Sequence, residues 1–222
     1  RSPRVMHARR VVLELLASSV DLSRTPGMDA LLAEYACDPG RYGPPAPPDP
    51  HRDGAVAGHH APPDPRFRAT VAQPVKVDNA LYVRDYAKCV LCYKCVEACG
   101  TDHQNTFAIA VAGRGFDARI STELATPLPD SACVYCGNCI AVCPTGALMA
   151  RTEWEMRQAG TWDASRQSTT DTICPYCGVG CTLTLHVQDG TIVKATSPLE
   201  NAITMGNLCI KGRFGWRYVQ AR

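Results

Sequence analysis

Residues 133–148 read CVYCGNCIAVCPTGAL, and residues 89–99 read CVLCYKCVEAC. Both stretches place their cysteines in the pattern C-x2-C-x2-C-x3-C, and the first cysteines, Cys89 and Cys133, are 44 residues apart. The pattern is therefore an internal repeat, which favours two copies of one structural unit. Thiols separated by two or three residues are too close for pairwise crosslinks across a fold, and they suit the binding of soft metals.

Iron–sulfur chemistry fits this spacing better than zinc does. Three cysteines at two-residue gaps can wrap one loop around a cubane, and the next helical turn carries the fourth thiolate to the other cluster. Zinc sites usually combine two separated pairs of ligands. We therefore expect two [4Fe–4S] clusters with crossed ligand sets. Cluster A should take Cys89, Cys92, Cys95 and Cys143, and cluster B should take Cys133, Cys136, Cys139 and Cys99.

A third group of cysteines has a different spacing, C-x2-C-x3-C-x27-C. Its members are Cys174, Cys177, Cys181 and Cys209. Gly178 and Gly180 lie inside the group, and we expect them to let the backbone fold tightly where a side chain would clash. The spacing alone is compatible with zinc as the metal bound by this group. Cys37 stands outside the three groups, and we expect it to be a small buried group or an idle thiol.

The composition excludes several classes of protein. A formal charge of +2 offers no basic field for nucleic acid, and no run of 18 apolar residues exists to span a membrane. The 13 cysteines are odd in number, so they cannot all pair, and clustered free thiols fit a reducing compartment. We therefore expect a cytoplasmic protein. Arg9-Arg10 could suggest an export signal, but Glu14 interrupts the apolar run that follows.

Hydrophobic periodicity predicts helices over 5–17 and 28–36, and a helical segment over 147–159. Residues 38–65 contain nine prolines, and PPAPPDP at 44–50 favours an extended linker or strap.

Two hairpins are also predicted. Residues 107–122 turn at Gly113-Arg114-Gly115, with Val111 and Ile120 on the two arms. Residues 182–188 and 191–197 alternate around Asp189-Gly190, a strong two-residue turn signal. The fold class is therefore α+β.

These signals divide the chain into four parts. We expect a helical segment, a Pro-rich linker, a two-cluster domain and a small β-rich domain that carries the third cysteine group, at residues 1–37, 38–75, 76–165 and 166–222; the resemblance described below implies that the last of these is a [4Fe–4S] domain.

Residues 76–150 resemble the bacterial two-cluster ferredoxins, on the strength of the repeated motif and above all of CVYCGNCIAVCPTGAL. The resemblance implies a pseudo-twofold α+β unit that holds two [4Fe–4S] clusters. Pro144 follows the second quartet as the family pattern expects, whereas Gly100 follows the first.

The third group, CPYCGVGC at 174–181 with LCIKGRFG at 208–215, resembles the N-terminal iron–sulfur domain of the molybdopterin-guanine-dinucleotide oxidoreductases. That superfamily includes formate dehydrogenases and nitrate reductases. The resemblance implies that Cys174, Cys177, Cys181 and Cys209 bind a [4Fe–4S] cluster, cluster C. It also implies that Lys211 helps electrons pass between this cluster and the pterin; the plainer interpretation of Lys211 is a solvated charge.

The combination looks like the α (catalytic) subunit of molybdenum- or tungsten-dependent formate dehydrogenases, in their soluble, NAD-linked branch. ARRVVLELLASSVDLS at 8–23 resembles a segment of that subunit, and of the large iron–sulfur subunit of respiratory complex I, that precedes a cluster held by one histidine and three cysteines. This chain has Ser19 and Ser23 there and no local cysteine, so we expect that cluster to be absent. Complex I itself is disfavoured, since we expect its subunit to lack the paired ferredoxin motif.

The implied function is electron transfer through three [4Fe–4S] clusters, between a molybdopterin centre that interconverts formate and carbon dioxide and a redox partner. The chain begins with Arg1 rather than Met, and the family's catalytic subunit is several times longer. We therefore expect the catalytic metal ligand, and the bis-molybdopterin guanine dinucleotide with Mo or W, to belong to the remainder of that subunit. Expected partners are that remainder and flavin/NAD-binding iron–sulfur subunits or another acceptor. The alternatives are a relay segment of another molybdopterin oxidoreductase or of a hydrogenase, and a non-enzymatic zinc protein.

Overall fold

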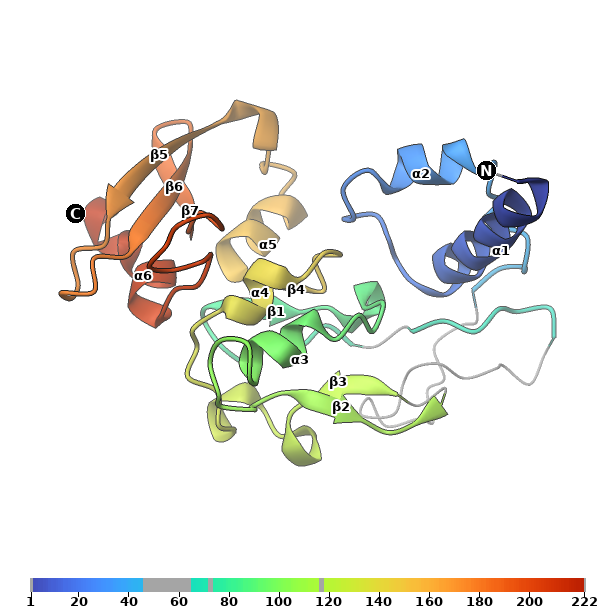
Figure 1. Cartoon of the computed structure of the whole chain (residues 1–222), viewed down its shortest axis with the longest axis horizontal. Helices are drawn as coiled ribbons and strands as arrows, with labels where there is room; N and C mark the ends of the chain where they lie inside the picture. The colour runs from blue at the N-terminus through green and yellow to red at the C-terminus, as the bar shows by residue number, and fades with distance from the viewer. Residues whose placement is uncertain (1, 46–64, 72–73, 116–117, 222) are drawn as a thin grey trace.

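A computed structural model describes residues 2–45, 65–71, 74–115 and 118–221 (Figure 1). Most of the expected Pro-rich linker, and the centre of the 107–122 hairpin, lie outside these residues. The α-helices are α1 (Pro3–Ser19), α2 (Met28–Glu34), α3 (Lys94–Cys99), α4 (Asn138–Val142), α5 (Arg151–Gln158) and α6 (Ile210–Phe214). The strands are β1 (Tyr82–Arg84), β2 (Ala110–Ala112), β3 (Arg119–Ser121), β4 (Leu148–Ala150), β5 (Gln167–Ile173), β6 (Thr182–Gln188) and β7 (Thr191–Thr196).

The N-terminal helices form where the periodicity predicts them. Ser2 caps α1, because its Oγ accepts a hydrogen bond from the Val5 N–H at 3.4 Å. Glu14 on α1 is fully buried, and its carboxylate accepts hydrogen bonds from Arg10, Arg41 and the Asp38 N–H. These bonds tie the helix to the segment after α2.

The ferredoxin-like unit is closed by its two outer strands. β1 pairs with β4 in antiparallel register, with Tyr82 opposite Ala150 and Arg84 opposite Leu148. The prediction of helix over 147–159 is therefore wrong at its start, since the helix begins only at Arg151. Pairing with β1, 64 or more residues away in the chain, imposes extended backbone on Leu148–Ala150 and buries Leu148 and Met149.

Both predicted hairpins are confirmed. β2 and β3 pair with Val111 opposite Ile120. β6 and β7 pair around Asp189 and Gly190, whose φ angles of 53° and 76° are those of a two-residue turn that matches strand twist. β5 is a strand that was not predicted, because its QSTTDTI sequence lacks apolar alternation. This strand pairs only with β6 at the edge of the sheet, where its side chains are mostly exposed.

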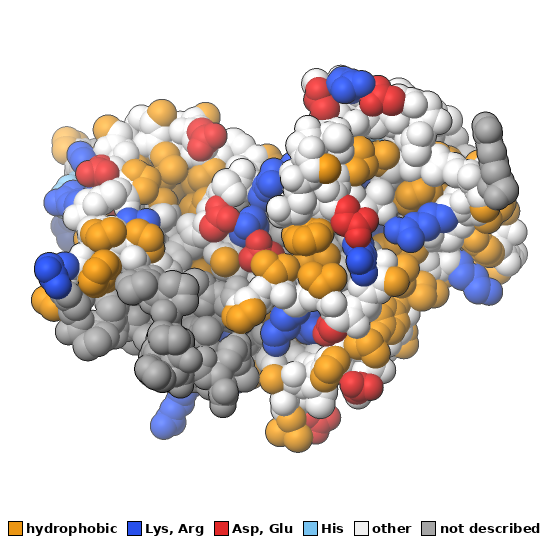
Figure 2. All heavy atoms as spheres, turned by 180° about the vertical axis from the view of Figure 1, so that it is seen from behind, with side chains coloured by type: hydrophobic (Ala, Val, Ile, Leu, Met, Phe, Trp, Pro, Cys, Tyr) orange, Lys and Arg blue, Asp and Glu red, His pale blue; other side chains and the backbone are white. Residues whose placement is uncertain are grey.

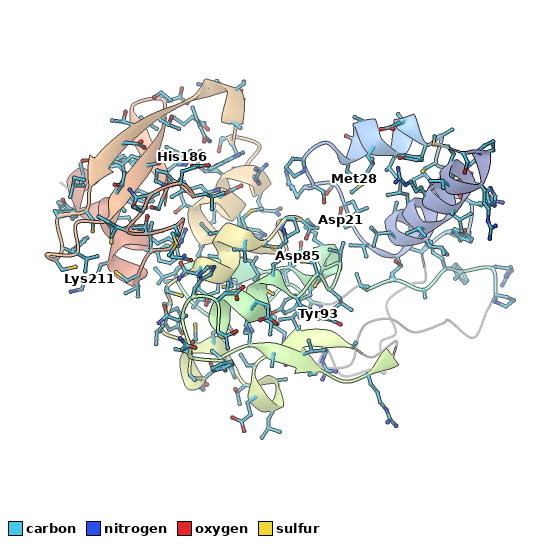
Figure 3. All side chains as sticks on the ribbon, in the orientation of Figure 1. Asp21, Met28, Asp85, Tyr93, His186 and Lys211 are labelled. Atoms are coloured by element: carbon cyan, nitrogen blue, oxygen red, sulfur yellow. The ribbon has the colours of Figure 1, made fainter. Side chains whose placement is uncertain are left out.

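The ferredoxin-like unit contacts both of its neighbours. Lys88 forms ion pairs with Asp21, from the segment after α1, and with Asp85. Figure 3 labels these two aspartates. On the other side, Lys194 of β7 pairs with Glu153 of α5 at 3.0 Å. Figure 2 shows Lys and Arg side chains interspersed with Asp, Glu and hydrophobic ones on the face it presents. Within the described residues, no helix is long and apolar enough to cross a membrane.

Candidate iron–sulfur sites

The two repeated cysteine loops have the same backbone shape. Leu91 and Tyr135, each two residues after the first cysteine of its loop, have φ angles of 54° and 56°. Each donates its backbone N–H to the sulfur of that cysteine, Cys89 or Cys133, at 3.4 Å. The helices α3 and α4 then begin at equivalent positions of the repeat. The sequence repeat is thus a structural repeat, with N–H donors already directed at sulfur.

The fourth cysteine of each motif is an electrostatic neighbour of cysteines in the other motif. The pKa of Cys95 is raised to about 12, first by burial and then by the charges of Cys89, Cys143 and Cys92. Burial likewise raises the pKa of Cys136, whose neighbours include Cys133 and Cys99. Burial strongly raises the pKa of Cys139, and the charge of Cys95 raises it as well. The two cysteine groups are therefore neighbours in the fold.

The cysteines themselves form much of this unit's core. Tyr86, Cys95, Ile109, Ile120 and Leu148 make one buried cluster. Further thiols pack against it, those of Cys89, Cys99, Cys139 and Cys143. Because burial raises the pKa values of Cys89, Cys95 and Cys139, metal must replace protons on these thiols when a cluster is bound.

The third cysteine group lies between the β-rich sheet and α6. Burial raises the pKa of Cys181, and Cys174, Cys177 and Cys209 are its charged neighbours. Cys174 is buried against Leu183 and Leu208, whereas Cys177 and Cys209 are exposed. Gly180 has φ of 66°, which favours glycine, but a Cβ at Gly178 or Gly180 would meet no described atom within 4 Å. Backbone conformation rather than a protein clash therefore explains Gly180.

Hydroxyl groups near the cysteine sulfurs were not found from the sequence. Tyr82 Oη lies 3.0 Å from Cys133 Sγ, and Thr106 Oγ1 lies 3.4 Å from Cys99 Sγ. Tyr82 is in β1 and is 2% exposed. No short pattern marks these residues, because they reach the sulfurs only through the folding of the unit.

Lys211 lies beside the third group. It is exposed on α6, and its Nζ is 5.9 Å from the ring centroid of Tyr176, a residue of the 174–181 loop. Figure 3 places Lys211 at the outer edge of the β-rich unit. Cys37 lies instead in the N-terminal unit, 3.8 Å from the Arg10 carbonyl oxygen, and burial raises the pKa of its thiol.

The three cysteine groups have the ligand types and the nearby hydrogen-bond donors that suit iron–sulfur clusters. Among the described residues, no group of three or more His, Cys, Asp or Glu side chains is placed to hold a metal ion. In a cubane each thiolate binds a different iron, so the ligands stand further apart than around one zinc ion. Grouped thiols, partial burial and hydrogen-bond donors at sulfur are the features that suit such clusters.

Two family comparisons match these units. Residues 167–221 match the family described as molybdopterin oxidoreductase Fe4S4 domain. Residues 81–149 match the family described as NADH-quinone oxidoreductase subunit 3, ferredoxin-like domain. The second match corrects the expectation that complex I lacks a comparable ferredoxin motif, which was our reason for disfavouring it.

Similar proteins include NADPH-Fe(3+) oxidoreductase subunit alpha of Geobacter sulfurreducens, 36% identical over 66% of this chain and 16% of the relative. A subunit of the NADH-quinone oxidoreductase of Rhizobium meliloti is 33% identical over 65% of this chain and 16% of the relative. A formate dehydrogenase-like protein of Staphylococcus haemolyticus is 25% identical over 67% of this chain and 18% of the relative. The chain thus spans less than a fifth of the length of these relatives.

Among solved structures, an NAD+-reducing [NiFe]-hydrogenase in the H2-reduced state matches with a TM-score of 0.46 and 20% identity, over 68% of this chain and 57% of that chain.

Proposed function

We propose that the chain passes electrons through three [4Fe–4S] clusters, on the premise that residues 81–149 and 167–221, which match the ferredoxin-like and Fe4S4 domain families, are iron–sulfur electron-relay domains of the NADH-quinone oxidoreductase and molybdopterin oxidoreductase type. One observation carries the proposal: twelve of the 13 cysteines fall in three quartets, and the members of each proposed quartet are electrostatic neighbours in the fold.

The proposed ligands are the crossed sets for clusters A and B, and Cys174, Cys177, Cys181 and Cys209 for cluster C. When bound, the clusters would supply one-electron redox chemistry. The chain's own residues would hold the thiolates, keep water away by burial, and donate hydrogen bonds to sulfur from Leu91, Tyr135 and Tyr82. We propose the four-part division given above, at 1–37, 38–75, 76–165 and 166–222, as the domain organisation.

We further propose that cluster C is the entry point for electrons from a molybdopterin centre that oxidises formate or runs the reverse reaction. Formate oxidation yields carbon dioxide, a proton and two electrons, so the relay would carry the electrons one at a time. The formate dehydrogenase-like relative supports this parent reaction. Bis-molybdopterin guanine dinucleotide, with Mo or W, would belong to the rest of the catalytic subunit, and flavin/NAD-binding iron–sulfur subunits would accept the electrons in the cytoplasm.

A second parent function has its own support. The Geobacter sulfurreducens relative, an NADPH-Fe(3+) oxidoreductase subunit, is more similar at 36% identity than the formate dehydrogenase-like protein at 25%. In that case the same relay would serve an NAD(P)H-linked oxidoreductase. Anaerobic reduction of the full-length enzyme's clusters by formate, compared with reduction by NADPH, separates the two parent functions.

The relay itself is tested by metal analysis and spectroscopy. Anaerobically prepared protein should contain about twelve irons per chain with negligible zinc, and should give [4Fe–4S] signals in electron paramagnetic resonance (EPR) after dithionite reduction. About eight irons with zinc present would remove cluster C, and a colourless zinc protein would overturn the proposal.

The role of Lys211 is tested in the full-length enzyme. A cation beside cluster C stabilises its reduced form and can hydrogen-bond the pterin. Lys211→Ala should therefore slow reduction of all three clusters by formate, while reduction by dithionite stays nearly unchanged. Arg217→Ala, which removes another exposed cation after α6, is the matched control. Formate reduction of Lys211→Ala at the wild-type rate would make the lysine a bystander.

A further inference from the structure

A buried arginine joins the second cysteine loop to the third. Arg213, on α6, is 5% exposed. Its Nε donates to the Cys136 carbonyl oxygen at 2.9 Å, and its Nη2 donates to Asn138 Oδ1 at 3.0 Å. Its own backbone N–H bonds the Cys209 carbonyl oxygen at 3.0 Å. The guanidinium therefore lies against the 136–138 loop, on a helix that begins at the last cysteine of the third group.

The second cysteine loop has space for the Arg213 side chain at Gly137, whereas the first cysteine loop has a tyrosine at the equivalent position. Gly137 has φ of 73°, and a Cβ there would clash with Cδ of Arg213 and come within 2.9 Å of its Nε. The equivalent residue of the first loop is Tyr93, which has a similar φ of 62° and is 41% exposed. The two copies share a backbone shape, so the missing side chain at Gly137 is a feature of the Arg213 contact rather than of the repeat.

Asn138 makes the contact a clamp. Its Oδ1 accepts from Arg213 and also from the Leu208 N–H at 3.1 Å, and the residue is 3% exposed. The equivalent position in the first loop is Lys94. The loop that precedes Cys209 is thus held directly against the loop that contains Cys136 and Cys139.

The charge of Arg213 has no carboxylate partner among the described residues, where its hydrogen-bond acceptors are a carbonyl and an amide. A buried cation without a counter-charge is strongly unfavourable. Burial lowers the pKa of Arg213, and the thiols of Cys139, Cys136 and Cys209 oppose that shift. A guanidinium nevertheless stays charged in proteins. By these contacts, the neighbours of Arg213 include cysteines of two different proposed quartets, Cys136 and Cys209.

We propose that Arg213 is the shared counter-ion of clusters B and C and sets the reduction potentials of both. The inference rests on the proposed function, because it requires both clusters to be bound. A [4Fe–4S] cluster gains one negative charge when it accepts an electron, so a buried cation favours the reduced form of each cluster near it. One guanidinium between two clusters would raise both potentials together and favour electron passage between them.

The test is an EPR-monitored redox titration of the iron-loaded protein, with signals assigned through serine variants of Cys95, Cys139 and Cys174. Arg213→Gln should shift the midpoint potentials of clusters B and C to more negative values and leave cluster A near its wild-type value. Arg213→Lys keeps the charge but loses the planar fork, and should restore both potentials. Asn138→Ala, which removes the clamp but not the charge, should shift them less than Arg213→Gln. Arg217→Gln removes an exposed cation and should change nothing.

Each result decides the matter. An Arg213→Gln protein in which only one cluster shifts, or neither, overturns the shared counter-ion. If Arg213→Gln fails to bind iron, Arg213→Lys decides, because shifted potentials with the charge retained would reduce the arginine to a structural clamp. A wild-type protein without clusters overturns the proposed function and this proposal together. If both proteins bind their clusters and Arg213→Gln keeps the wild-type midpoint potentials, this proposal alone is overturned.

Discussion

The phenolic oxygen of Tyr82 lies 3.0 Å from the sulfur of Cys133, 51 residues further along the chain. Burial raises the pKa of the Tyr82 phenol far above its usual range, and Cys139 and Cys133 raise it further. The phenol therefore keeps its proton and acts as the donor to a Cys133 thiolate. The rings of Tyr135 and Phe214 lie 6.1 and 6.4 Å from the Tyr82 ring, so the hydroxyl has a fixed direction.

Removing this hydroxyl should lower the potential of cluster B. A hydrogen bond to sulfur stabilises the more negative, reduced cluster, and a net loss of about 1 kcal/mol corresponds to about 40 mV for one electron. Tyr82→Phe should therefore lower the midpoint potential of cluster B in an EPR-monitored titration, and leave cluster A unchanged. Tyr93→Phe, which changes an exposed tyrosine of the first loop (Figure 3), is the control. An unchanged potential in Tyr82→Phe would show that the contact does not act on the cluster.

Cys99→Ser should perturb the distant cluster rather than the local one. Under the proposed crossed ligation, in which the fourth cysteine of each motif binds the other motif's cluster, we expect cluster B to lose its signal or about four irons, while cluster A persists. Cys37→Ser, outside the three quartets, should leave all signals intact. Loss confined to cluster A would show that each motif binds its own cluster.

Gly137→Ala should destabilise the loaded protein through two effects. A left-handed backbone costs a residue with Cβ roughly 1–2 kcal/mol, and overpacking against Arg213 adds about 1–3 kcal/mol. Gly160→Ala shares a positive φ of 69° but has no atom within 4 Å of the added Cβ, so it isolates the backbone effect. Anaerobic thermal unfolding should rank Gly137→Ala well below Gly160→Ala. Equal melting temperatures would contradict the close Gly137–Arg213 contact.

Removal of iron should unfold residues 76–222. Cysteine side chains form part of the hydrophobic core of both units. The free energy of metal binding to these cysteines is therefore expected to supply much of the folding free energy. Complete chelation under anaerobic conditions should abolish most strand signal in circular dichroism, and reconstitution with iron and sulfide should restore it. A native-like spectrum in the iron-free protein would refute this dependence.

The N-terminal unit should lose stability in acid through Glu14. Its pKa is lowered to about 2, first by the hydrogen bond from Arg10 and then by the Asp38 N–H, whereas an unfolded glutamate titrates at about 4.3. A depressed folded pKa stabilises the folded state above the unfolded value, and that contribution is lost as pH falls from about 5 toward 2. The protection factors of the α1 amides, which are corrected for the pH dependence of intrinsic exchange, should fall over this range.

Glu14→Gln should weaken α1 already at pH 7 and flatten this pH dependence. Glu155→Gln, at an exposed ion pair with Arg151, should leave the exchange of α1 unchanged. Protection factors in α1 of the wild type that stay constant between pH 5 and 2 would remove Glu14 from this role.

The local features of this protein could be read from its sequence, because short spacing and turn chemistry act within a few residues. The cysteine gaps indicated iron–sulfur chemistry, and Asp189-Gly190 placed the β6–β7 hairpin where it lies. The two copies of the repeat differ at one informative position, since Tyr93 of the first loop corresponds to Gly137 of the second. Only the structure shows that the absent side chain at Gly137 makes space for Arg213.

The sequence by itself determined the metal-binding chemistry and the hairpins, and only the tertiary structure decided which residues surround the thiols. Leu148–Ala150 became a strand because β1 pairs with it, and Arg213 became a buried cation because α6 packs against a loop 75 to 77 residues earlier. Arg213 lies two residues from the exposed Lys211, and nothing in the local sequence distinguishes the buried cation from the solvated one. Burial and distant hydrogen bonds depend on the packing of the whole chain, and local propensity does not contain them.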